Sequence, residues 1–153
     1  MDHEKGIVSC SLNQTLQQRP YELDFFQAVR RLECAHPELP RVGHAQRPQG
    51  DLVRFSQNVS LGFSPSAVHA FYEATSEHPR QMVVNFMGLH GTNGPMPLCI
   101  TEYVHDRLHN CRDKTLACFL DIFNHRMICL FYRAWACTQQ TASYDRQAEE
   151  KFA

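Results

Sequence analysis

Apolar residues in the first part of the chain change from helical to strand-like spacing. The first group of apolar residues recurs every three or four positions and predicts a helix over residues 24–34. Pro37 disfavours continuation of this helix beyond that range. Between residues 53 and 63, apolar side chains occupy the odd positions except Gln57. This alternation predicts one bent strand or two short strands with one buried face. A second strand is predicted over residues 82–87, and a short helix carrying Val68, Phe71 and Tyr72 within residues 65–77.

The second part of the chain lacks the two strongest helix breakers. All seven glycines and all eight prolines precede Leu98, so we expect long helices after it. Residues 97–110 form the first, with a proline in its first turn, and residues 115–137 form the second. We therefore divide the chain into an N-terminal extension (1–19), a mixed helix and strand region (20–97), a helical region (98–137) and a polar C-terminal helix or tail (138–153).

The predicted helix over residues 115–137 is apolar around most of its circumference. We expect its main apolar stripe to comprise Leu116, Phe119, Leu120, Phe123, Met127, Leu130, Phe131 and Ala134. A second stripe on the other side would comprise Cys118, Ile122, Cys129 and Ala136. Such a helix is normally packed on more than one side, and a short chain has few elements with which to surround it. We infer that a partner, or further chain, covers one face.

Length and composition narrow the class of protein. The 153 residues carry 15 Lys and Arg against 16 Asp and Glu, which suits one globular domain and provides no overall field for binding nucleic acid. The first twenty residues contain no apolar run typical of a signal peptide, and the stretch 127–132 is too short for membrane insertion. We interpret the seven cysteines as reduced thiols, mostly buried, in a cytoplasmic protein.

Three patterns could carry chemistry, and each has a structural alternative. His105 and His109 lie one helical turn apart near Cys99 and Cys111, which allows a metal site or a surface pair. Asp121, His125 and Cys129 repeat every four residues, as they could in a thiol enzyme or in a structural hydrogen-bonded row. The stretch 88–97 is rich in glycine and lies between a strand and a helix, so it could bind phosphate or form a turn. Neither zinc nor nucleotide signatures are complete, and we expect the structural alternative in each case.

Several blocks of sequence occur together in an order that resembles one protein family. They are Pro20-Tyr21 with residues 24–33, Val53-Arg54-Phe55, Ser60-Leu61-Gly62-Phe63, residues 86–97 with Thr101-Glu102, residues 119–126 and residues 130–135. In this order they resemble the N-terminal part of TssG, a baseplate subunit of bacterial type VI secretion systems. The resemblance covers most of the chain, and members of the family are longer, so we expect this chain to be truncated relative to them.

The pattern of elements predicts an α+β fold, with a loop-rich N-terminal part of short antiparallel strands followed by long helices. The resemblance implies that this fold is wedge-like, as in contractile-tail baseplates. It implies a structural scaffold that assembles with two copies of TssF and with TssK and TssE. This baseplate docks on the membrane complex at the cytoplasmic face of the inner membrane and supports tube and sheath assembly. It implies no catalytic residue, metal or cofactor. The alternative, from the residues alone, is a small cytosolic enzyme that depends on a metal or thiol in the His- and Cys-rich helices.

The same helix supplies the predicted partner interface. Its polar interruption and the aromatic and arginine residues after it suit binding hot spots: Asn124, His125, Arg126, Phe131, Arg133 and Trp135. The alternative is that this cluster fixes the helix against its own domain. We expect Arg126→Ala and Trp135→Ala to weaken TssF capture more than they lower the melting temperature.

Overall fold

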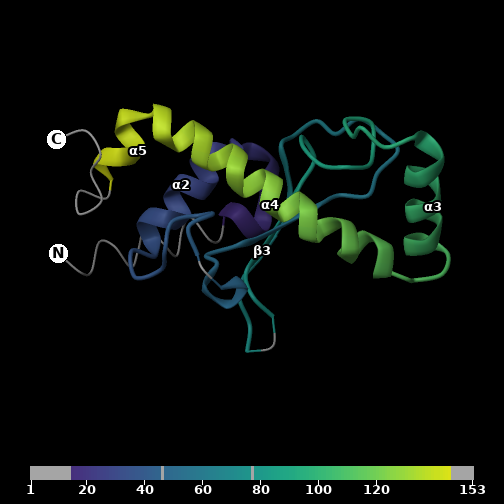
Figure 1. Cartoon of the computed structure of the whole chain (residues 1–153), viewed down its shortest axis with the longest axis horizontal. Helices are drawn as coiled ribbons and strands as arrows, with labels where there is room; N and C mark the ends of the chain where they lie inside the picture. The colour runs from purple at the N-terminus through teal and green to yellow at the C-terminus, as the bar shows by residue number, and fades with distance from the viewer. Residues whose placement is uncertain (1–14, 46, 77, 146–153) are drawn as a thin grey trace.

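The computed structural model describes residues 15–45, 47–76 and 78–145 as helices around a small sheet. Helix α4 (Thr115–Thr138) runs diagonally across the molecule and connects its two ends (Figure 1). At one end it lies beside α3 (Leu98–His109) and irregular loops, and at the other beside α2 (Phe25–Ala35) and α5 (Gln140–Tyr144). This arrangement confirms the α+β class. Most of the predicted extension 1–19 and the end of the predicted tail lie outside the described residues.

Helix α2 begins where the sequence predicts. The carboxylate of Asp24 accepts hydrogen bonds from the backbone N–H groups of Phe26 (3.0 Å) and Gln27 (3.3 Å), which caps the first turn. A 3-10 turn, η1 (Pro20–Glu22), precedes it, and residues 15–18 add a helical turn whose Leu16 is fully buried. The inner face of α2 joins the main core through Phe25, Ala28, Val29 and Leu32.

The sheet has three short strands in the order β1-β3-β2: β1 (Arg54–Gln57), β3 (Gln81–Val84) and β2 (Val68–Tyr72). β2 and β3 are antiparallel, but β1 and β3, the two segments that the sequence predicts as strands, are parallel, so the expectation of antiparallel strands is wrong for this pair. The sheet is therefore mixed, a feature that strand spacing alone does not reveal. A further 3-10 turn, η2 (Pro48–Gly50), lies in the connection before β1.

The predicted short helix within residues 65–77 is wrong, because this segment forms β2. Val68 and Phe71 are both buried, although their spacing of three does not fit a regular strand. The register shifts between Val68 and Ala70, so the strand contains a bulge there. A bulge inserts one extra residue, which lets two side chains three apart face the same core.

The strand predicted across residues 53–63 is too long. Val53 and Phe55 are buried as expected, but β1 ends at Gln57, and Leu61 (43% exposed) and Phe63 (87% exposed) lie at the surface. The second strand is likewise shorter than predicted and ends at Val84. Gln57, the polar interruption of the alternating pattern, marks the point at which regular pairing stops and a different set of hydrogen bonds begins.

Two hydrophobic clusters lie along α4. The larger one joins α2, the sheet and the C-terminal half of α4, which contributes Ile128, Cys129 and Tyr132. The smaller one contains Val59, Val104 and Leu120, between α3, a loop and the N-terminal half of α4. The predicted bounds of α3 and α4 are confirmed to within a residue or two. The single long helix thus belongs to both cores.

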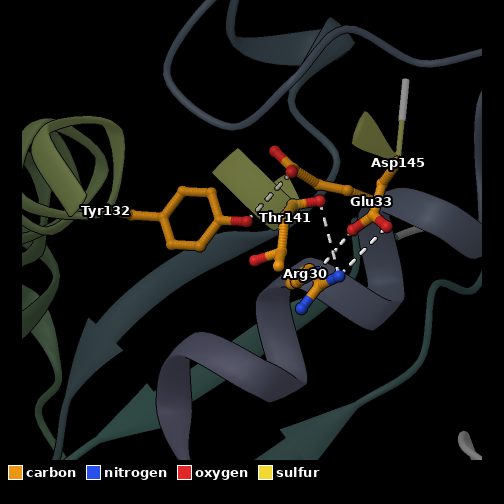
Figure 2. Close-up of polar contacts among 5 residues, drawn as sticks. All are labelled: Arg30, Glu33, Tyr132, Thr141 and Asp145. Carbon is orange, nitrogen blue, oxygen red and sulfur yellow. Dashed lines mark hydrogen bonds and ion pairs between the residues drawn. The ribbon is translucent and has the colours of Figure 1, made fainter. Parts of the chain in front are cut away.

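A polar clamp fastens the C-terminal helix to α2 (Figure 2). Arg30 forms an ion pair with Asp145, donating to one carboxylate oxygen from Nη2 at 3.0 Å, and the same Nη2 donates to the carbonyl of Thr141. Beside it, the hydroxyl of Tyr132 donates to Glu33 at 2.9 Å. Because these contacts join α2 to α4 and α5, they fix the C-terminal end of α4 on the main core.

Candidate protein interface

Helix α4 covers the open edge of β1 with side chains. The N–H of Gln57 donates to Asp121 at 2.9 Å, and the N–H of Phe55 donates to Nδ1 of His125 at 3.2 Å. Asp121 and His125 are one helical turn apart, and Phe55 and Gln57 are alternate residues of the strand, so the two spacings match. The donors that a fourth strand would pair are therefore satisfied by a helix, which also protects the edge.

A second polar cluster connects β1 and α4 to the glycine-rich loop. The buried amide of Gln57 accepts from the N–H of His90 (3.2 Å) and donates to the carbonyl of the same residue. Asn124, which is fully buried on α4, accepts from the N–H of Leu89 at 3.0 Å. A Cβ at Gly88 would lie 2.0 Å from the Gln57 side chain, so any larger residue there would displace the hydrogen-bonded amide. Polar groups in the core thus hold the loop in place.

The phosphate-binding alternative does not fit this loop. Its three successive N–H groups at Leu89, His90 and Gly91 donate to Asn124, Gln57 and Thr101, the last at 3.1 Å. A phosphate cradle needs such amides directed at a ligand. Here they are used within the chain, and the loop acts as a structural connection between β3 and α3.

The row Asp121, His125 and Cys129 is also engaged in structure. Since Nδ1 of His125 accepts from Phe55, its Nε2 carries the proton and donates to Asp51 at 3.2 Å. Burial lowers the pKa of His125, an effect that Asp51 partly opposes. Burial raises the pKa of the Cys129 thiol to about 12, so the thiol is protonated at neutral pH. The row therefore provides neither a free base nor a thiolate nucleophile.

The two histidines of α3 lie in the C-terminal half of the helix. The rings of His105 and His109 are 4.2 Å apart, and Cys99 and Cys111 are both exposed. Across residues 15–45, 47–76 and 78–145, no three His, Cys, Asp or Glu side chains converge as metal ligands would. The expectation that most cysteines are buried is wrong, because Cys129 alone is buried among those described.

The six residues predicted to contact a partner have different environments. Asn124 and His125 face inward, in the contacts described above. Arg133 donates to the carbonyl of Gly43 at 3.2 Å, and Trp135 stacks on Phe26 with ring centroids 4.6 Å apart. Arg126 is exposed, and Phe131 is 42% exposed while its inner edge contacts Phe26 and Phe86. Only these last two project a substantial surface outward.

The outward face of α4 consists largely of apolar side chains. This finding corrects the predicted positions of the apolar stripes on the helix. The side chains that face the core are Leu120, Asn124, Ile128, Cys129 and Tyr132, whereas much of the predicted main stripe faces outward. Phe119 is 54% exposed, Phe123 50%, Leu130 51% and Ile122 65%. The error has a physical cause: a buried asparagine lies at the centre of the core face, and a pattern of hydrophobic residues cannot identify it.

Helix α3 extends the apolar surface. Leu98 (65% exposed), Ile100 (38%) and Tyr103 (54%) project from it, and α3 lies beside the N-terminal half of α4 (Figure 1). We define the α3–α4 apolar face as the exposed large apolar side chains of these two helices: Leu98, Ile100, Tyr103, Phe119, Ile122, Phe123, Leu130 and Phe131. Apolar side chains exposed along one face of a helix, as Phe119, Ile122, Phe123 and Leu130 are on α4, mark interaction sites on soluble proteins. We therefore treat this face as the candidate protein interface.

Sequence reasoning missed Gln57 and Thr101 as the residues that hold the loop. The signal for Gln57 was present, since it is the single polar residue on an otherwise apolar strand face. No sequence pattern predicted the role of Thr101. Its hydroxyl accepts a hydrogen bond from the N–H of Gly91 only because α3 places the two groups together.

The fold and this apolar face are typical of a subunit that functions within a larger assembly. Comparison with known families identifies which assembly: the model of a family described as "Type VI secretion, TssG" matches residues 19–153. The chain belongs to the TssG family, which is part of the type VI secretion baseplate. Comparisons with curated proteins and with solved structures found no match. Within the described ranges, none of the helices has the length and apolarity needed to span a bilayer.

Proposed function

We propose that the chain is a structural scaffold subunit of the baseplate wedge and that the α3–α4 apolar face is its contact with TssF. The observation that carries the proposal is the exposure of Phe119, Ile122, Phe123 and Leu130 along one helix. A residue of this size contributes about 1.5–3 kcal/mol when it passes from water to an apolar contact. Because these side chains are already about half-buried, a partner that covers this face gains roughly half of that free energy from each of them.

Membership of the TssG family supports a proposal for the rest of the assembly. We propose that two copies of TssF bind the chain, that TssK and TssE join the same wedge, and that the baseplate docks on the membrane complex at the cytoplasmic face of the inner membrane. The role is one of assembly and not of catalysis. The two polar clusters around α4 support this scaffold role, because they hold α4 in a fixed position to which a partner can bind.

The six predicted interface residues divide into two groups under this proposal. Arg126 and Phe131 contact the partner directly, since both are exposed on α4. Asn124, His125, Arg133 and Trp135 hold the helix in position. We therefore expect Arg126→Ala to weaken TssF capture at an unchanged melting temperature. Trp135→Ala should lower the melting temperature as well, because the ring stacks on Phe26.

The test is co-expression of the chain with tagged TssF, followed by affinity purification. The double variant Phe123→Asp and Leu130→Asp should reduce the retained chain at least about tenfold, since it places two charges in an apolar contact. Tyr72→Asp is the matched control, because Tyr72 is 58% exposed but lies on β2, away from the face. Retention of the double variant at the level of the control would overturn the proposal.

A further inference from the structure

Helix α3 has a small share of the hydrophobic core. It lies at the opposite end of α4 from α2 (Figure 1), and only Thr101 and Val104 of its twelve residues are buried. Among the residues that the structure describes, the cluster it joins contains three buried apolar side chains, whereas the larger cluster around α2 contains sixteen. Because buried apolar surface supplies most of the stabilisation of a fold, α3 is held less firmly than α2.

The polar contacts of α3 are also short-range. Thr101 accepts from the N–H of Gly91 at 3.1 Å, and Arg107 forms an ion pair with Asp113 at 2.6 Å. In the part of the chain that the structure describes, no hydrogen bond or ion pair joins α3 directly to α4 or α2. The two side-chain contacts that clamp α2 (Figure 2) instead join residues 115 and 99 positions apart. Contacts within a short segment survive when that segment separates from the core, but contacts between distant segments must break.

Two special backbone positions flank the helix. Of the three described residues with positive φ, Gly91 (+82°) precedes α3 and Arg112 (+54°) follows it. Glycine adopts this left-handed conformation freely, whereas a residue with a Cβ adopts it only when its surroundings hold it there. The chain therefore turns sharply on both sides of α3, and α4 is not bent when α3 moves. We call residues 92–111, between these two turns, the α3 unit.

We propose that the α3 unit opens as a body, independently of the larger hydrophobic cluster, and that its closure on α4 assembles the α3–α4 apolar face. In the closed arrangement, α3 contributes Leu98, Ile100 and Tyr103 to that face. A partner that contacts both helices binds the closed form more tightly and shifts the population towards it. The identity of this partner as TssF rests on the proposed function, but the opening is a property of the chain alone.

Hydrogen exchange of the full chain tests the opening, under conditions in which the exchange rate reports the opening equilibrium. The amides of residues 102–109 in α3 should exchange at least about 100-fold faster than those of residues 29–35 in α2, after correction for the rates of unstructured peptides. The reason is that α3 exchanges through its own opening, whereas α2 exchanges only when the larger cluster unfolds.

Two core variants separate local opening from global unfolding. Val104→Ala truncates a side chain of the smaller cluster and should speed exchange in α3 at least about tenfold. Ile128→Val is the matched variant in the larger cluster, which stays folded when the α3 unit opens. It should speed exchange in α2 about threefold or more and leave α3 within about twofold of the parent.

Two results with the isolated chain would overturn the proposal. They are equal protection of α2 and α3 in the parent, and equal acceleration of both helices by Ile128→Val, since either result means that the chain opens as one unit.

Addition of purified TssF tests the coupling to binding, and it should raise the protection of residues 102–109 at least about tenfold. TssF that retains the chain without raising this protection would overturn the coupling and leave the scaffold function intact. Failure of TssF to retain the chain would instead refute the scaffold function, and exchange in the isolated chain would still decide whether the α3 unit opens.

Discussion

At the scale of single residues, Gln57 joins β1 to both the glycine-rich loop and α4. It is buried, and its amide serves both the N–H and the carbonyl of His90. We expect Gln57→Leu to lower the free energy of unfolding by about 2–3 kcal/mol, because both loop groups lose their partner in the core. Urea denaturation measures this. Gln49→Leu, at an exposed position, should leave the transition unchanged, and equal midpoints for the two variants would contradict the role of Gln57.

His90 gives the protein a dependence on pH. Its side chain is fully buried, neither ring nitrogen has a hydrogen-bond partner among the residues that the structure describes, and burial lowers its pKa. Because the folded pKa lies below the value of about 6.5 in an unfolded chain, the stability from His90 is complete above about pH 6.5. It is lost as the pH falls through the folded pKa, since the protonated ring must leave the core.

His90→Leu should therefore flatten the decline of melting temperature below about pH 6.5. Thermal melts across that range compare the variant with the parent, and the difference between the two curves isolates His90 from Asp121, whose pKa burial raises. His109→Leu, at an exposed position, should retain the slope of the parent. An identical slope in His90→Leu would show that the buried ring does not control acid stability.

At the scale of elements, the contact between α4 and β1 is unusual because a helix completes a sheet edge. Asp121→Ala should lower the free energy of unfolding by roughly 1–3 kcal/mol and expose the Gln57 N–H, whereas Asp121→Asn retains an acceptor. Hydrogen exchange of the Gln57 amide reports this directly. Protection should fall in Asp121→Ala and persist in Asp121→Asn. Unchanged protection in the alanine variant would mean that the carboxylate does not hold the edge.

Elements with one clear period could be predicted from the sequence, and those with a local irregularity could not. Helices α2, α3 and α4 have the expected bounds, because Asp24, Pro97 and the absence of later Gly and Pro all act locally. β2 was missed, because its bulge gives Val68 and Phe71 a helix-like spacing. The parallel pairing of β1 and β3 depends on how distant strands meet, and no local signal specifies that.

The candidate site shows the same limit for polar residues. The sequence identified Asn124 and His125 as the polar interruption of α4 but could not tell an inward from an outward direction. Their partners, Leu89 and Phe55, are far away along the chain. The excess of apolar surface on α4 was predictable because it depends on composition alone, and the exposure of Phe119, Phe123 and Leu130 confirms it.

At the scale of the whole molecule, α4 links the two hydrophobic clusters and carries much of the uncovered surface between them. The larger cluster, with α2 and the sheet, anchors its C-terminal half, and the clamp in Figure 2 secures that end. The smaller cluster, with α3, holds its N-terminal half. The two clusters therefore hold both halves of α4 in place, and the outward side of this helix remains exposed for a partner.

The most direct test of this interface is photocrosslinking in the assembled complex. Benzoylphenylalanine in place of Phe123, co-expressed with TssF and irradiated, should form a covalent adduct with TssF that mass spectrometry identifies. The same residue in place of Tyr21, which is 59% exposed on η1, should form none. An adduct from position 21 and none from position 123 would contradict the claim that the α3–α4 apolar face is where the baseplate partner binds.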